Sequence, residues 1–470
     1  MRAGALALAA AYILCVLPAE AQPPATPTPG TPTPGTPTPG TPKPGTQAPT
    51  GVEQEPTPSG ILPNVQIPGV LLPPRSLLDF IYAPPAQGPL VLTPSLAITE
   101  EFNDNVFLTS SRKRSDFITQ FTPGLLLQMQ QPGFTLLSNV NFTAEIFAKE
   151  SELNNVANRI GFLTTVMYQA TPGVTLTLTD NFVFSRDNPS TVAFSGVSNG
   201  RQESWSNVLA PAVSVQLTQR TTWRVFGGYT LERVSNSNSG SNNGSNNGSN
   251  NGSRNSGDSN IYRIGTGFDH TLTPRLTFTA AYDFGYLDVQ QEPTAFTHTL
   301  RVGGSYRLTP TLSVTATAGP SVLITDHDTS ISPAVTARLT KEMSWGAMNA
   351  LYDSSFGTSG AFGGLSENQS FGGDISVRTL LRNLFVALSA RYSISKTTGA
   401  SQTNSDIDAF TATLSARYQI ARYIGLVGGY TFLRQRGSGN GNPVGSTNNI
   451  DVDQNRVNFG IQFGYPINFD

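Results

Sequence analysis

Cysteine and charge are both scarce in this chain. Cys15 is the only cysteine among 470 residues. Because it lies in an N-terminal segment that we expect to be removed, the mature chain has neither a disulfide nor thiol chemistry. Charged residues make up 13% of the sequence, about half the usual share of a soluble protein. The formal net charge is -2, so nothing indicates a nucleic-acid partner.

Long hydrophobic runs are also missing. Beyond the N-terminal leader, no apolar run is long enough for a membrane-spanning helix. Hydrophobic residues are only 38% of the chain, which is low for a soluble core of this size, whereas glycine is frequent at 45 residues. If the protein crosses a membrane, it must do so as a closed β-barrel, in which only alternate residues face lipid.

The first 21 residues have the pattern of a signal peptide. Arg2 supplies a positive start, residues 3–17 form a short apolar stretch, and Ala19-Glu20-Ala21 is a cleavage site with small residues at its ends. A lipoprotein signal at Cys15 is the alternative, but the bulky residues 12–14 fit it poorly. We therefore expect an exported protein.

Residues 22–89 form a proline-rich segment. A five-residue repeat runs from Pro29 to Gly45, and such a sequence is extended and buries no core. We expect a disordered periplasmic linker, with contact to peptidoglycan as the alternative. Residues 60–89 add apolar clusters that would plug a lumen, dock a partner or lead into the barrel, and the sequence does not decide among these.

The C-terminal stretch has a clear period of two. Apolar residues occupy every second position from Val457 to Phe469, and asparagine, glycine, glutamine or proline lies between them. This alternation predicts one continuous strand with lipid on one face and a wet lumen on the other. Similar alternating segments of ten to fifteen residues recur from Leu90 onward.

Short and long connections alternate between these segments. Long polar loops, of which 235–259 with its Asn-Gly-Ser repeats is the longest, alternate with short turns. The short turns are expected at Gln131-Pro132-Gly133, Thr171-Pro172-Gly173, Gln219-Arg220, Thr273-Pro274-Arg275, Thr309-Pro310-Thr311, Lys341-Glu342, Leu381-Arg382-Asn383 and Ala421-Arg422. Short periplasmic turns and long outer loops are typical of bacterial outer-membrane barrels, and the count predicts an all-β, antiparallel transmembrane barrel of about 18 strands at 90–470.

Two stretches resemble known proteins. Gln462, Gly464, Ile467 and Phe469 resemble the C-terminal assembly signal of bacterial outer-membrane barrels, which implies that the barrel-assembly machinery reads the last strand. The sequence from Glu100 to Phe107, followed by Asp116, resembles the opening hairpin of an outer-membrane β-barrel porin family. Members of that family often occur with capsule or exopolysaccharide systems. This resemblance implies passage of polar or saccharide solutes and supplies no catalytic residues.

Residues for catalysis or metal binding are few. His270, His298 and His327 are the only histidines, and none shares a lumen face with a plausible nucleophile. Aspartate and asparagine recur in the outer loops at 103–105, 326–328 and 451–453 without the spacing of a calcium loop, so solvated loop residues are the expectation. We expect no enzyme activity, no metal and no cofactor.

Alternation places many arginines inward. The expected inward arginines are Arg159, Arg224, Arg263, Arg301, Arg307, Arg338, Arg378, Arg391, Arg417 and Arg456. The expected inward acids are fewer: Glu101, Glu145, Glu232, Asp269, Asp283 and Asp374. Arg301, Arg378, Arg391 and Arg417 come from one side of the barrel, which predicts a charge filter that favours anions. The alternative is that these arginines simply pair with the acids.

These patterns predict a channel in the outer membrane of a Gram-negative bacterium. The expected activity is passive passage of small polar or anionic solutes, with saccharide export as a variant. The expected partners are membrane lipid, the assembly machinery and, as further options, peptidoglycan or polysaccharide-export components. A filled barrel with outward polar loops and a structural role is the alternative.

Overall fold

The computed structural model describes residues 89–186, 201, 203–235, 258–290, 292–358, 364–378, 381, 383–398, 405–439 and 451–469. The expected signal peptide and, except for Pro89, the expected linker lie outside the described residues, as does nearly all of the Asn-Gly-Ser loop. Within the described part of the chain, no helix has the length and apolarity needed to cross a bilayer.

Strands make up nearly all of the described structure, with one short 3-10 helix, η2 (Ser151–Leu153). The strands are β1 (Leu90–Asn103), β2 (Asp116–Gln131), β3 (Phe134–Phe147), β4 (Asn155–Thr171), β5 (Val174–Ser185), β6 (Glu203–Thr218), β7 (Thr221–Ser235), β8 (Ser259–Thr273), β9 (Leu276–Val289), β10 (Ala295–Thr309), β11 (Leu312–Thr325), β12 (Thr329–Met343), β13 (Gly346–Thr358), β14 (Leu365–Val377), β15 (Leu384–Thr397), β16 (Ser405–Ala421), β17 (Ile424–Gly439), β18 (Val452–Gly464) and β19 (Ile467–Phe469).

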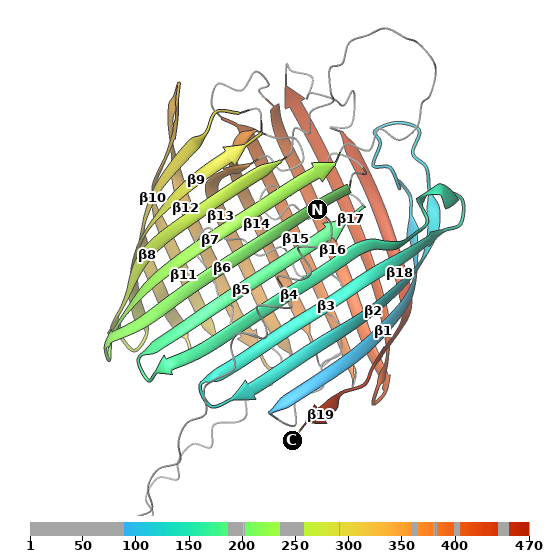
Figure 1. Cartoon of the computed structure of the whole chain (residues 1–470), viewed down its shortest axis with the longest axis horizontal. Coiled ribbons are helices and arrows are strands. Elements are labelled where there is room, and N and C mark those ends of the chain that lie inside the picture. The colour runs from blue at the N-terminus through green and yellow to red at the C-terminus, as the bar shows by residue number, and fades with distance from the viewer. Residues whose placement is uncertain are drawn as a thin grey trace, which may run out of the picture. The chain divides into compact units, whose positions relative to one another are not determined.

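The strands form one closed antiparallel sheet. Each strand pairs with its neighbours along the chain, and β1 pairs with β18 from Ser95 opposite Gly464 to Asn103 opposite Arg456. Figure 1 shows the tilted strands, with β1 in blue beside β18 and β19 in red. Because β19 continues the direction of β18 along β1, the wall has 18 strands. The prediction of an all-β barrel with about eighteen strands is confirmed.

The short connections repeat one local design. Most join strands through two residues, as at Pro132 and Gly133, where Gly133 has a φ of 75° that a residue with a side chain rarely adopts. A register shift precedes several of these turns, for example between Gln169 and Thr171. The turn predicted at Lys341-Glu342 is misplaced, because both residues still pair with β13 and the chain reverses after Met343.

The predicted single strand from Val457 to Phe469 is interrupted. β18 ends at Gly464, and β19 starts at Ile467 and pairs, among the described strands, with β1 alone. Proline 466 lies in the gap and cannot donate a backbone hydrogen bond, so the ladder stops there. The register of β1 is nevertheless kept across the gap, because Leu92 lies opposite Ile467 and Ser95 opposite Gly464.

The outer face of the barrel is apolar. Large side chains such as Leu388, Phe268 and Phe459 remain 45%, 46% and 60% exposed. Aromatic residues contact one another near both ends of the strands, as in the Tyr229–Tyr262 and Tyr423–Tyr465 pairs. A closed barrel with an apolar exterior and aromatic girdles is the form in which strands cross the outer membrane of Gram-negative bacteria. The chain is an outer-membrane barrel, and lipid surrounds its wall.

Candidate pore and its constriction

The inner face of the wall carries hydroxyl, amide and charged groups. Hydroxyl pairs join neighbouring strands, at 2.8 Å between Thr299 and Ser321 and at 3.0 Å between Thr122 and Thr143. Such residues alternate with the lipid-facing ones because successive side chains of a strand point to opposite faces. The inner wall is therefore able to hydrogen-bond water and polar solutes.

Several inward arginines pair with acids on adjacent strands. Arg456 binds both carboxylate oxygens of Glu101 at 2.9 Å, which joins β18 to β1. Three similar pairs are Arg301–Asp283 at 2.6 Å, Arg224–Asp269 at 2.8 Å and Arg159–Glu145 at 3.2 Å. These four arginines pair with acids, which was the alternative to a charge filter. Their positive charge is largely compensated within the wall.

The four expected filter arginines occupy two levels of the barrel. Arg301 and Arg391 lie in the middle of β10 and β15. Arg378 is exposed just after β14, and its backbone N–H donates to the carbonyl oxygen of Trp345 at 2.9 Å. Arg417 pairs with Phe385 near the short-turn end of β15. The four arginines thus lie at two levels along β10 and the stretch from β14 to β16.

Arg378 and Arg417 lie on either side of β15 at the short-turn end. Val377, the residue before Arg378, pairs with Val386, and Phe385 pairs with Arg417. Both arginines therefore approach the position of Phe385 from opposite sides. By the usual orientation of such barrels, this end opens to the periplasm.

Arg301 and Arg391 belong to a charged cluster in mid-barrel. Arg301 and its partner Asp283 are each 4% exposed. Arg263 of β8 interacts electrostatically with Asp283 and Asp353, and Arg391 interacts with Asp353 in turn. Three arginines and two aspartates leave the cluster with a formal charge of 3 - 2 = +1. The cluster connects the inner faces of β8–β10 with those of β13–β15.

Toward the long-loop end, β13 separates from β12. Their pairing stops at Val335 opposite Ser354, whereas β12 stays paired with β11 as far as Thr329. The β13–β14 hairpin continues to Thr358 opposite Leu365. The final residues of this hairpin are therefore free to leave the cylinder of the wall.

The end of the hairpin packs against the inner wall. Phe356 and Leu365, which are 4% and 1% exposed, form one buried cluster with residues of β8, β9, β10 and β11. Those partners are Ile261, Leu287, Val289, Ala295 and Leu323. The Ser332 hydroxyl on β12 donates to the carboxylate of Glu367 on β14 at 2.6 Å, across the position that β13 has left. The hairpin thus folds into the mouth, and we call residues 354–358 and 365–368 the inner hairpin.

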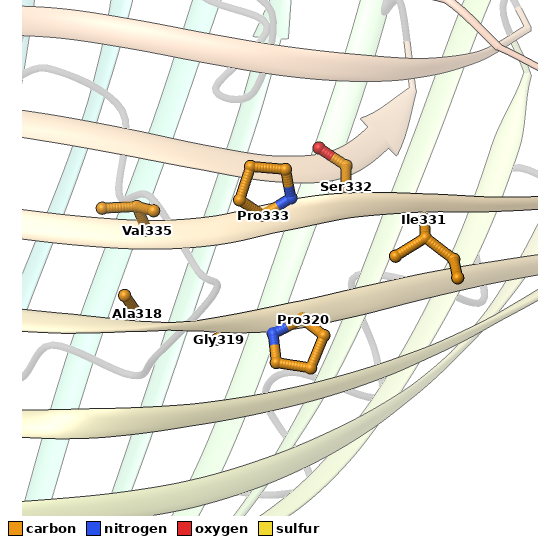
Figure 2. A pocket seen from close by; sticks show the side chains of 7 residues that line it. All are labelled: Ala318, Gly319, Pro320, Ile331, Ser332, Pro333 and Val335. Carbon is orange, nitrogen blue, oxygen red and sulfur yellow. The ribbon is translucent and has the colours of Figure 1, made fainter.

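An apolar depression lies on the outside of β11 and β12, next to the place where β13 separates from β12. Ala318 and Pro320 of β11 and Ile331, Pro333 and Val335 of β12 line it. Figure 2 shows the two prolines on neighbouring strands, and Ile331 is 72% exposed. Proline offers no N–H to a neighbouring strand, so Pro333 fits the place where pairing with β13 ends.

Sequence reasoning missed Asp353 and the inner hairpin. Asp353 is 6% exposed and accepts a hydrogen bond from the Thr336 hydroxyl at 2.8 Å. Strict alternation identifies Asp353 as inward, so this signal was present in the sequence. The same alternation assigns Phe356 to the lipid face, and only the departure of β13 from β12 turns that face toward the inner wall.

The residues of the expected assembly signal lie at the closing seam. Gln462 points inward at 6% exposure, and Gly464 ends β18. Ile467 and Phe469 are exposed to 37% and 45% and belong to the outward set of alternate residues. They occupy the side of the wall that an external assembly factor reaches, and recognition by that factor stays a prediction.

The asparagine-rich loop after β1 is structural. Asn105 is fully buried, and its side-chain amide donates to the carbonyl oxygens of Thr109 and Asp453 at 2.8 and 2.9 Å. The expectation that this loop is merely solvated is wrong for Asn103 and Asn105. Among the described residues, no group of three His, Cys, Asp or Glu side chains has the geometry of a metal site.

The two histidines on strands lie on the outer face. His298 accepts from or donates to the Tyr282 hydroxyl at 2.8 Å, and His270 has the same relation to Thr221 at 2.9 Å. These positions agree with the expected place of His298 on the apolar face and of His270 near a periplasmic turn.

No family model and no curated protein sequence matches this chain. Among solved structures, it resembles OpdL of Pseudomonas aeruginosa at 11% identity and a TM-score of 0.40, with 80% of this chain and 99% of that chain covered. OpdQ of the same organism gives 11% and 0.42, with coverage of 80% and 99%. OccAB3 of Acinetobacter baumannii gives 8% and 0.40, again with 80% and 99%. Likeness at this level adds nothing to the argument from strand pairing.

The barrel implied by the resemblance at 100–107 is present, whereas its association with capsule or exopolysaccharide systems stays a prediction.

Proposed function

We propose that this barrel is a passive outer-membrane channel for small polar or anionic solutes. The observation that carries the proposal is the contrast between the two faces of one closed 18-strand wall. Its outside is apolar, whereas its inside carries hydroxyl, amide and paired charged groups. Barrels of this strand number leave room for an aqueous channel inside.

The mid-barrel cluster is the proposed selective element. Arg391 interacts electrostatically with Asp353, and Arg263 interacts with both aspartates of the cluster, so solutes that pass would meet charges of both signs with one positive charge in excess. In a narrow aqueous pore with low-dielectric walls, such an excess favours anions. Arg378 and Arg417 would add positive charge at the periplasmic opening. Arg301 contributes least, because Asp283 compensates its charge at 2.6 Å.

The test is single-channel recording in a planar bilayer under a salt gradient. We expect a steady conductance whose reversal potential indicates anion preference. Replacing Arg391→Ser should lower the anion-to-cation permeability ratio about twofold, since one local positive charge disappears from a narrow section. Lys396→Ser is the matched control, because Lys396 lies on the same strand but belongs to the outward set of alternate residues.

The control variant should leave the permeability ratio unchanged. An equal shift for both variants would show that only the overall charge matters, and the filter proposal would fail. Cation preference of the unaltered channel would also contradict the filter, whereas absence of conductance from folded protein would contradict the channel itself.

The inner hairpin favours the second candidate, a barrel without an open pore. Its apolar contacts cover part of the mouth on the side of β8–β11. Deleting residues 355–366 and joining the strands with a short turn separates the two candidates. If the unaltered barrel conducts and the deletion raises the conductance, the hairpin narrows an open channel. If only the deletion conducts, the native barrel is closed and the structural role takes precedence.

Saccharide export is a narrower form of the channel proposal. The hydroxyl pairs of the inner wall suit neutral sugars as well as water. Liposome swelling with neutral and anionic oligosaccharides would test it, because swelling with small ions but with neither saccharide restricts the channel to small solutes. Contacts with peptidoglycan or with export components would come from residues outside the described part of the chain.

A further inference from the structure

Four polar side chains interrupt the lipid-facing surface of β3–β6. Ser138, Thr164, Asp180 and Asn207 each occupy an outward position on successive strands. The outward residues around them are large and apolar, such as Val140, Tyr168 and Leu209, which are 40%, 48% and 36% exposed. We call these four residues the polar row.

Direct contacts link the members of the polar row in pairs. The hydroxyls of Ser138 and Thr164 lie 2.8 Å apart, and the Asn207 side-chain amide donates to the Asp180 carboxylate at 2.7 Å. Thr164 is the direct cross-strand partner of Asp180. The row is therefore continuous over four strands.

Asp180 lies at a costly position. On its own strand, the outward neighbours are Leu176 and Leu178 toward one end and Phe182 and Phe184 toward the other. A carboxylate between such residues faces the hydrocarbon region, where charged groups on the lipid face of a barrel are destabilising. One amide partner satisfies only part of the hydrogen-bonding capacity of a carboxylate, which has about four lone-pair sites. Lipid alone is a poor cover for this surface.

Cations of the barrel itself do not reach the polar row. In the described strands, outward lysines and arginines lie near strand ends, and none lies between the apolar residues of mid-strand. They are Arg233, Lys341, Lys396, Arg434 and Arg436. The groups available to cover Asp180 are hydroxyls and amides.

We propose that the polar row is an interface with a second copy of this chain. A twofold axis along the membrane normal, passing between β4 and β5, brings Asp180 of each copy next to Thr164 of the other. Each hydroxyl is both donor and acceptor, so the same surface complements itself, as a twofold contact requires. Polar side chains of this kind hold membrane segments together because lipid offers them no alternative partner.

Single cysteines give a direct test, because Cys15 is the only natural cysteine and lies in the expected leader. Thr164→Cys places one thiol at the centre of the proposed contact. In isolated outer membranes, mild oxidation should convert most of this variant into a disulfide-linked dimer. Leu388→Cys, also outward and mid-strand but on β15, is the matched control and should stay monomeric.

A second variant removes the polarity and keeps the barrel. Asp180→Leu with Asn207→Leu, made in the Thr164→Cys background, should lower the dimer yield at least tenfold. The folded barrel should persist, seen as faster gel migration before heating, because leucine suits a lipid-facing position better than an acid does. Thr266→Leu removes another outward hydroxyl, which the Trp223 indole N–H contacts at 2.7 Å, and should leave the dimer yield unchanged.

Three results would overturn the proposal. Equal cross-linking at Thr164→Cys and Leu388→Cys would indicate random collision in a crowded membrane. Cross-linking of Thr164→Cys only to a different protein would assign the row to another partner. A Thr164→Cys barrel that stays monomeric under oxidation would show that lipid covers the row after all. Conductance is not part of this test, so its outcome is independent of the channel proposal.

Discussion

Two seams of the same wall, β1–β18 and β12–β13, differ in a way that chain connectivity does not explain. β12 and β13 are joined by a tight turn, yet their pairing ends at Val335 opposite Ser354. β1 and β18 are separated by almost the whole barrel, yet they pair up to Asn103 opposite Arg456. Side chains rather than covalent proximity hold a barrel seam closed.

The side chains at the two seams explain the difference. Along β1–β18, the Gln454 amide donates to the side chain of Asn103 at 3.1 Å and to the Asn105 carbonyl at 2.7 Å, next to the Arg456–Glu101 ion pair. At the β12–β13 seam, Pro333 lacks an N–H, and the hydroxyl of Ser354 bridges to its carbonyl at 3.2 Å. The closing seam has a buried polar network with an ion pair, whereas β12 and β13 are joined by isolated hydroxyl bonds, at 2.8 Å from Thr336 to Asp353, at 2.9 Å from Thr340 to Asn349 and at 3.2 Å from Ser354.

The largest effect should come from shortening the closing seam. Deleting Phe469 and Asp470 removes one of the three residues with which β19 pairs to β1, together with the end of the expected assembly signal. We expect the amount of folded barrel in the outer membrane to fall at least fivefold, measured as the fast-migrating unheated band. Deleting Asp470 alone is the control. Normal amounts of folded barrel for the longer deletion would contradict the assembly signal.

Breaking the ion pair of the closing seam should have the next largest effect. Glu101→Leu leaves Arg456 without its bidentate partner, and loss of one member of a buried pair typically costs about 3–5 kcal/mol. Because Glu101 is 3% exposed, a loss near this range is expected in the free energy of unfolding, measured by urea titration in detergent. Glu100→Leu, one residue away and outward, tests specificity and should cost less than about 1 kcal/mol.

The smallest effect should come from the open seam. Ser354→Ala removes the bridge to Pro333 and should lower the free energy of unfolding by about 1 kcal/mol, the usual net value of one hydrogen bond. The same urea titration measures it. A cost as large as that of Glu101→Leu would show that the two seams are equally dependent on side chains, and the comparison between them would fail.

Much of the fold follows from sequence periodicity. The alternation around Leu388 and the proline-glycine turn at 132–133 specify strands and reversals locally, so strand number and inward faces were predictable. Lys341 and Glu342 were misplaced as a turn because charged residues are also accepted at the aqueous end of a strand. The break at Pro466 was readable, since proline lacks the N–H that the ladder needs.

The site was less predictable because it depends on which strands leave the cylinder. Alternation identified Arg301 and Arg391 as inward, but their link runs from Asp283 through Arg263 of β8 to Asp353 of β13, and no local signal in the sequence brings these strands into one cluster. The parity of Phe356 is outward, which would place it against lipid, and no local signal reports that β13 has separated from β12. Asp180 is different, since a carboxylate within an apolar series is visible in the sequence itself.

The hydrogen bond from Asn105 to the Asp453 carbonyl joins residues 348 positions apart. Contacts of such high sequence separation form late, because nearly the whole chain must be ordered before they are gained. Until β18 arrives, Glu101, Asn103 and Asn105 at the outer end of β1 lack the hydrogen bonds that Arg456, Gln454 and Asp453 supply, and water is expected to take their place. A barrel that has not finished inserting therefore exposes polar groups of β1 to water. Closure of the wall satisfies these groups, because Asn105 then bonds the Asp453 carbonyl and Asn103 accepts from Gln454.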